Sequence, residues 1–188
     1  MQINHDYFQK FRILDGGVGQ ELLARGVKPV SNLWSTTALL KKEYHNILLD
    51  CHLDFINAGA EIILTNTFGS RRRRLEENNL LSEFENLNLT ALKIAEEAVK
   101  KSGKKIIIAG SLPPQNFTYI SDLGDDKKLI EKNFHDQAKI LNNGVDLFYL
   151  DVMSSLEECE IAIQSIKEFN KPLIIGIHCK KNGLLPSG

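Results

Sequence analysis

The segment HLDFINAGAEIILTNTFG, residues 52–69, contains the transition that decides the fold. Its first residues end a helical pattern running from 45 to 57, in which apolar side chains recur on one stripe. Residues 61–68 form an almost continuous apolar and β-branched run, as expected of a strand buried on both faces of a parallel sheet. The segment therefore predicts a helix followed directly by a buried strand.

The same two patterns alternate along the rest of the chain. Four more strands are predicted, at residues 11–15, 105–112, 147–152 and 172–179, and a further helix at 84–100. Ser82 with Glu85, and Ser154 with Glu157, have the spacing of capping boxes that begin helices. Alternation of this kind predicts a parallel α/β architecture, either open and doubly wound or closed into a barrel.

Polar side chains at the carboxyl ends of the predicted strands favour the barrel. They are Asp15, Asn66, Thr67, Ser111, Asp151, His178 and Cys179. In a (β/α)8 barrel these ends form the active-site face, whereas an open sheet collects ligand contacts at one switch point. Such barrels need about 250 residues, and this chain has 188. We therefore expect a TIM-barrel type fold with about the first five β/α units, as a single domain over residues 1–188, truncated at its carboxyl end.

Composition indicates a soluble globular protein, with 43% hydrophobic and 25% charged residues. The net charge of −1 gives no general attraction to nucleic acid or to an anionic membrane. No apolar run approaches the roughly 20 residues of a membrane span. The three cysteines are far apart and suggest a reducing compartment, so we expect a cytoplasmic protein.

Three places have side chains suited to chemistry. The turn Asp15-Gly16-Gly17 brings backbone N–H groups within reach of a carboxylate or phosphate, although a tight turn capped by Asp15 explains it equally well. It is not a dinucleotide fingerprint, because Leu22 replaces the last glycine. Asn66 and Thr67 need hydrogen-bond partners, from a loop or a substrate. Asp151 is suited to holding an ammonium group, acting as a base or capping a helix.

Two other features favour structural interpretations. His178 and Cys179 are adjacent in a predicted strand, so they point to opposite faces and cannot share a metal ion. The run from Arg71 to Arg74 is typical of a solvated loop that enters a helix, with Leu75 packed inward. Its functional alternative is a patch that steers an anionic co-substrate.

Taken in order, several stretches resemble the homocysteine S-methyltransferase family. They are ILDGGVGQEL at 13–22, LWSTTALL at 33–40, HLDFINAGAEIILTNTFGSRRRRL at 52–75, LNLTALKIAEEA at 87–98, IAGSLPP at 108–114 and, more loosely, LFYLDVMSSLEE at 147–158. The resemblance spans nearly the whole chain. The DGG turn, the AGAEIILTNTF block and AGSLPP are specific because they occur together.

The resemblance implies a (β/α)8 barrel in which zinc, held by three cysteines, binds homocysteine as a thiolate that accepts a methyl group to give methionine. By position, Asp15, Gly16 and Gly17 resemble part of the amino-acid pocket. Asn66 and Thr67 resemble pocket-lining residues. Asp151 stands where the family usually has a glutamate that contacts the substrate amino group, and it is one methylene shorter.

The family's zinc cysteines follow the sixth strand and lie near the eighth, beyond Gly188, so we expect neither a zinc ligand nor a catalytic residue within this chain. Our leading hypothesis is a homocysteine S-methyltransferase that uses homocysteine and a methyl donor, with the 188-residue chain inactive alone. The alternative is a non-catalytic amino-acid-binding protein, or a half-barrel completed by a partner, that lacks the zinc site. The methyl donor and the oligomeric state stay open.

Overall fold

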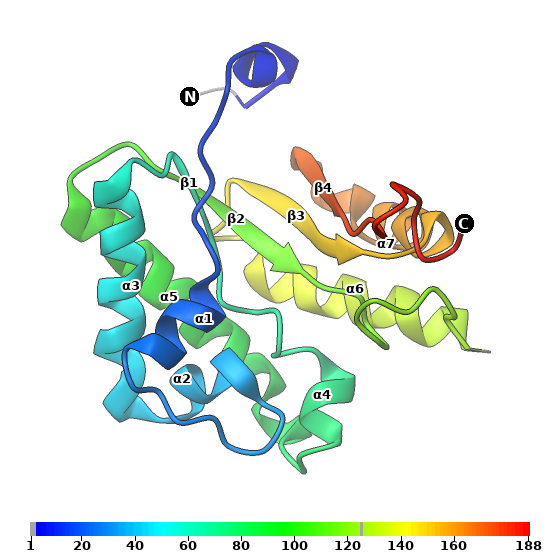
Figure 1. The fold of residues 1–188 in the computed structure, drawn as a ribbon, viewed down its shortest axis with the longest axis horizontal. Helices are drawn as coiled ribbons and strands as arrows, with labels where there is room; N and C mark the ends of the chain where they lie inside the picture. Colours follow the sequence, from blue (N-terminus) through cyan, green and yellow to red (C-terminus); the bar gives the residue numbers. More distant parts are fainter. Residues whose placement is uncertain (1–2, 125) are drawn as a thin grey trace.

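A computed structural model describes residues 3–124 and 126–188 and has the α/β architecture that the sequence predicts (Figure 1). Four strands pair in parallel in the order β1-β2-β3-β4, namely Ile62–Leu64, Ile107–Leu112, Leu147–Met153 and Leu173–Ile177. Each strand lies beside its predecessor in sequence. Because the order never reverses within this sheet, it has no topological switch point, and the barrel-type arrangement is favoured over the doubly wound one.

Helices lie between the strands. The α-helices are α1 Val18–Ala24, α2 Thr37–Leu40, α3 His45–Ala58, α4 Arg72–Glu76, α5 Phe84–Ser102, α6 Lys127–Leu141 and α7 Leu156–Ile166. Short 3-10 helices occupy His5–Gln9, Trp34–Thr36, Lys42–Tyr44, Leu81–Glu83 and Lys167–Phe169. The long helices form one layer, in which α3 packs on α5, α5 on α6 and α6 on α7. None of the helices in the described part of the chain is long and apolar enough to cross a membrane.

The two helices predicted from periodicity are confirmed to within two residues, but both predicted capping residues are wrong. Ser82 lies inside a 3-10 turn, and the helix that follows begins after Glu83 without a side-chain cap. The cap of α7 is Ser155, whose side chain accepts a hydrogen bond from the Glu158 N–H at 3.1 Å. The helix therefore starts at Leu156, one residue later than the Ser154 spacing suggests.

The first predicted strand, 11–15, forms only a single bridge, between Leu14 and Ile62. The segment still lies beside β1, because the Asp15 N–H donates to the Ile62 carbonyl at 2.9 Å. Phe11 and Ile13 are largely exposed, so their side chains add little packing that would extend a ladder. The turn at Gly16 then ends the extended stretch. The correction therefore concerns the length of this strand and leaves its place in the order unchanged.

The core lies on both faces of the sheet. One cluster fills the space between the strands and the helices and includes the buried side chains of Phe134, Phe148 and Leu150. A smaller cluster on the other face contains Ile62, Ile107 and other apolar side chains of the strands. Strands β1 to β3 thus have the two-sided burial that their sequences predict. Strand β4 does not, because every residue in it keeps some exposure.

A matched pair of substitutions in α6 tests this assignment of the core. Ile130 is 1% exposed and its neighbour Leu129 is 48% exposed. We expect Ile130→Ala to lower the free energy of unfolding by about 2–5 kcal/mol, because it removes buried methyl groups and leaves a cavity. Leu129→Ala should change it by roughly 0.5 kcal/mol or less. Urea denaturation measures both values, and equal losses would contradict the orientation of α6.

Candidate active site

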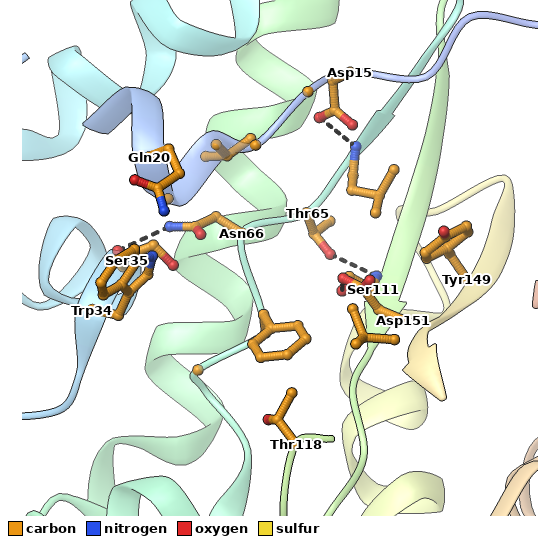
Figure 2. A pocket seen from close by; sticks show the side chains of 18 of the residues that line it. Asp15, Gln20, Trp34, Ser35, Thr65, Asn66, Ser111, Thr118, Tyr149 and Asp151 are labelled. Atoms are coloured by element: carbon orange, nitrogen blue, oxygen red, sulfur yellow. Dashed lines mark hydrogen bonds between the residues drawn. The ribbon is translucent and has the colours of Figure 1, made fainter. Parts of the chain in front are cut away.

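A cavity of about 790 Å³ lies at the carboxyl ends of the strands (Figure 2). Its volume is typical of sites for small-molecule ligands. Five of the six residues proposed from the sequence line it, namely Asp15, Gly16, Gly17, Asn66 and Asp151. Thr67 does not line it. Segments from the first 20 residues and from the ends of β1, β2 and β3 thus meet around one space, as they do on the active-site face of a barrel.

A hydrogen bond to the backbone of β1 fixes the position of the Asp15 side chain in the cavity wall. Its carboxylate accepts a hydrogen bond from the Leu64 N–H at 2.9 Å, at the end of β1. Burial raises the pKa of Asp15 to about 7, and the nearby negative charge of Asp151 acts in the same direction. The carboxyl group therefore changes charge close to neutral pH, which is unusual for an aspartate.

Asp151 faces the same cavity from β3. Its carboxylate accepts a hydrogen bond from the Ser111 hydroxyl at 3.0 Å, which links the ends of β2 and β3. Burial raises the pKa of Asp151 as well, while the Ser111 bond opposes that change. Two carboxyl groups with few hydrogen-bond donors around them make this part of the cavity suited to a cation, and an ammonium group would stabilise both in the ionised form.

The backbone next to Asp151 is irregular. The register between β3 and β4 shifts between Leu150 and Met153, and Val152 has a φ of 60°. A β-branched residue in the left-handed region is uncommon and strained. Both Asp151 and Val152 line the cavity. The distortion therefore lies at the point where β3 presents its carboxylate.

Of the two glycines in the DGG turn, Gly16 is required by close packing, whereas a Cβ atom at Gly17 would meet only ordinary contacts with Gln20. A Cβ atom at Gly16 would lie 2.8 Å from Cε1 of Phe55, on α3, so a larger residue would force the turn away from the helix layer. Gly17 precedes α1 and also faces the cavity. The glycines thus let the backbone run between the helix layer and the cavity.

The side chains that end β1 have different roles. The Asn66 amide donates to the Ser35 carbonyl at 3.0 Å and lines the cavity. Thr67 is fully buried, and its hydroxyl donates to the Ser111 carbonyl at 2.7 Å while contacting the Thr65 hydroxyl at 2.9 Å. Thr67 therefore braces β1 against β2 beneath the cavity, and Thr65 takes its place in the lining.

Sequence reasoning missed the four aromatic residues of the lining, Trp34, Phe68, Tyr119 and Tyr149. Tyr149 stands two residues before Asp151 on β3, so strand alternation places both on one side and gives a usable signal. Trp34, the single tryptophan of the chain, lines the opposite wall and packs on Gly19. A Cβ atom at Gly19 would lie 2.1 Å from its Nε1. No local pattern in the sequence predicts that contact.

The remaining candidates lie outside the cavity lining, with one exception. His178 packs edge-on against Tyr119, and Cys179 is exposed. Leu75 is fully buried, as expected, but Arg71 is only 2% exposed, so its predicted solvation is wrong. The exception is Arg74, which lines the cavity.

No metal site is formed by the residues that the structure describes. No group of three His, Cys, Asp or Glu side chains among them is arranged to hold an ion. Cys51 is buried in α3, and burial raises the pKa of its thiol to about 12. Cys159 is also buried, in α7. These residues therefore do not fit the zinc that the family resemblance implies.

Comparison with known proteins gives a consistent result. The profile of the family described as homocysteine S-methyltransferase matches residues 12–188. Homocysteine S-methyltransferase 2 of Saccharomyces cerevisiae is 28% identical over 203 residues, which cover 96% of this chain and 61% of the yeast protein. S-methylmethionine--homocysteine S-methyltransferase BHMT2 of Pongo abelii is 25% identical, over 77% of this chain and 37% of that protein.

Solved structures agree with the fold. The metallated form of the homocysteine methyltransferase MmuM from Escherichia coli superposes with a TM-score of 0.83 at 19% identity, covering 98% of this chain and 69% of that chain. Its oxidized form gives the same score at 20% identity. The fold predicted from the strand ends, of TIM-barrel type, is thereby confirmed.

The titration of Asp15 gives a testable pH dependence. The folded chain keeps this proton between pH 3.8 and about 7, where the unfolded chain has released it, so this group makes folded stability fall as pH rises through that window. We expect Asp15→Asn, which retains an oxygen for the Leu64 N–H, to flatten the fall. Urea denaturation between pH 4 and 8 measures the difference, with Asp50→Asn at an exposed position of α3 as control. Parallel curves for the Asp15→Asn and native chains would contradict the assignment.

Proposed function

Because the chain belongs to the homocysteine S-methyltransferase family, we propose that its cavity binds homocysteine for transfer of a methyl group to the homocysteine sulfur. The chain spans 61% of the length of the yeast relative. The proposal therefore concerns the part of the reaction that these residues perform, which is to bind and orient the amino-acid end of homocysteine.

One observation carries the proposal: Asp15 and Asp151, which are far apart in the sequence, face one cavity at the carboxyl ends of parallel strands. The ammonium group of homocysteine binds between these carboxylates. Ser111 holds Asp151 in place, and the backbone of β1 holds Asp15. Gly16, Gly17 and Asn66 form the adjoining wall and contact the remainder of the amino acid, while Thr67 keeps β1 and β2 together beneath it.

The reaction joins the methyl group of an activated donor to the homocysteine sulfur and gives methionine. A thiol must lose its proton to become an effective nucleophile. Among the described residues no group of three His, Cys, Asp or Glu side chains is arranged to hold a metal ion, and the contribution proposed for these residues is orientation of the substrate. S-methylmethionine is the donor named for one relative, and its sulfonium centre is an activated methyl group of the kind required.

The proposal also covers the domain organisation of the chain and the compartment in which it works. One sheet with one continuous helix layer supports a single domain over residues 1–188. The three cysteines are free in the structure, which suits the reducing conditions of the cytoplasm.

Asp151 is the sharpest test of this function. Loss of a charge-assisted hydrogen bond costs on the order of 1.5–3 kcal/mol, so Asp151→Ala should weaken homocysteine binding by about tenfold to a hundredfold. Asp151→Glu should bind as well as the native chain or better, because it restores the length of the family's usual side chain. Isothermal titration of the chain with homocysteine gives both constants, and Asp50→Ala controls for loss of an acidic residue.

If glutamate abolishes binding while alanine leaves it intact, Asp151 has only a structural role and the pocket assignment fails. Titration with norleucine, which carries the same ammonium and carboxylate but no thiol, separates recognition of the amino-acid end from recognition of sulfur. The proposal requires Asp151→Ala to weaken both ligands in parallel.

Zinc provides an independent test. We expect the 188-residue chain to retain much less than one equivalent of zinc after dialysis, because its cysteines are separated and two are buried. Elemental analysis of the dialysed protein, alongside a Cys179→Ser variant, measures this. One equivalent of zinc in the native chain would overturn the expectation, and its loss in Cys179→Ser would identify Cys179 as a ligand.

A further inference from the structure

Residues 113–119, here called the cover segment, follow β2 and bring Thr118 and Tyr119 into the cavity lining. Figure 2 shows Thr118 at the end of the cavity away from Asp15. The segment has no regular helix or strand, and Tyr119 has a φ of 67°. Its position must therefore come from side-chain contacts with other elements.

The strongest of these contacts comes from Arg71. Both terminal nitrogens of its guanidinium donate to the Thr118 hydroxyl, at 3.1 and 3.2 Å. Arg71 is 2% exposed, and its Nε has no hydrogen-bond partner among the described residues. A buried guanidinium is costly to desolvate. The negative charges of Glu158 and Glu77 favour it, but loss of the Thr118 hydroxyl would leave its buried terminal N–H groups without this acceptor. This dependence makes the contact between Arg71 and Thr118 a strong constraint.

The start of the cover segment is held separately. Glu158, 1% exposed on α7, accepts a hydrogen bond from the Gln115 N–H at 2.9 Å. The Gln115 side chain donates to Gln137 on α6 at 3.2 Å. The segment is thus attached to α6 and α7 at its beginning and to Arg71 near its end.

Arg73 and Arg74 share an ion pair with Glu77, but each of the other three arginines of the run also has a contact of its own. Arg73 stacks on the Phe117 ring, with 3.8 Å from its Cζ to the ring centroid, and so adds a second contact to the cover segment. Arg74 donates to the Asn32 carbonyl, two residues before Trp34 on the opposite wall. Arg72 instead pairs with Asp136 on α6, at 2.7 Å, and does not line the cavity.

We propose that Arg71 is a positioning residue, which holds Thr118 and with it the cover segment in the wall of the cavity. The arginines of the run from 71 to 74 then hold different neighbouring segments in place. The burial of Arg71 is explained by its contact with Thr118, without the anionic co-substrate that the sequence suggested as an alternative. Arg71 acts through Thr118 and does not itself line the cavity.

The test compares Arg71→Gln with Arg72→Gln, two substitutions that each remove one positive charge from neighbouring positions. Phe117 and Tyr119 are exposed aromatic residues within the cover segment, so chymotrypsin cleavage there reports its release. We expect Arg71→Gln to speed this cleavage by about tenfold or more, since local opening follows the loss of the attachment. Arg72→Gln should leave the cleavage rate within about twofold of the native value. Mass spectrometry identifies the cut sites.

A second pair of variants keeps the test decisive if Arg71→Gln unfolds the chain. Thr118→Ser retains the acceptor hydroxyl and should cleave at the native rate, whereas Thr118→Val removes it and should match the expected release. Far-UV circular dichroism confirms that each variant is folded. Equal cleavage in the Ser and Val variants, or equal acceleration by Arg71→Gln and Arg72→Gln, would overturn the proposal.

A binding experiment extends the inference to the ligand and rests on the proposed function. Fluorescence of Trp34, the only tryptophan, reports occupancy of the cavity. The proposed function puts the homocysteine ammonium beside Asp15, so the end of the cavity at Thr118 is left for the methyl donor (Figure 2). We therefore expect Thr118→Val to weaken S-methylmethionine about tenfold relative to Thr118→Ser, and to leave homocysteine within about twofold. Equal weakening of both ligands would overturn this extension. Failure of the native chain to bind either ligand would count against the proposed function, while the cleavage rates would still decide the role of Arg71.

Discussion

Hydrogen bonding between the buried strand ends is the constraint on which the cavity depends. Thr67 and Thr65 contact each other, Thr67 donates to the Ser111 carbonyl, and the Ser111 hydroxyl donates to Asp151. The second and third of these bonds join the end of one strand to the end of the next, among buried or half-buried side chains, where an unsatisfied polar group is costly. The strands therefore cannot shift against one another without losing several of these bonds, and the cavity keeps its shape.

Electrostatics at the site follows from this rigidity. Asp15 and Asp151 are held in partly desolvated positions near each other, and burial raises both pKa values. A cationic ligand supplies a positive charge that stabilises both carboxylates in their ionised form. Stability and binding are therefore opposed at these residues: the carboxylates destabilise the empty protein when ionised and favour the occupied one.

The sequence predicted what depends on periodicity and local chemistry. Buried runs located β1 to β3, apolar periodicity placed α3 and α5 closely, and polar strand ends identified Asp15, Asn66 and Asp151 as neighbours of one space. Contacts between distant segments were not predictable. The burial of Arg71 depends on Thr118, 47 residues away, and the exposure of β4 depends on what packs beside it. Such features are set by tertiary packing, on which local patterns give no information.

The left-handed conformation of Val152 has a consequence for how this fold tolerates change. A residue with φ of 60° in a strand end is held there by its surroundings at a cost of about 1–3 kcal/mol. Glycine would adopt the same backbone without that cost, so selection for stability alone would favour glycine at this position. It would also make the backbone beside Asp151 more flexible. Directed evolution for heat resistance is therefore expected to replace Val152 with glycine, which would raise stability but fix the position of the Asp151 carboxylate less firmly.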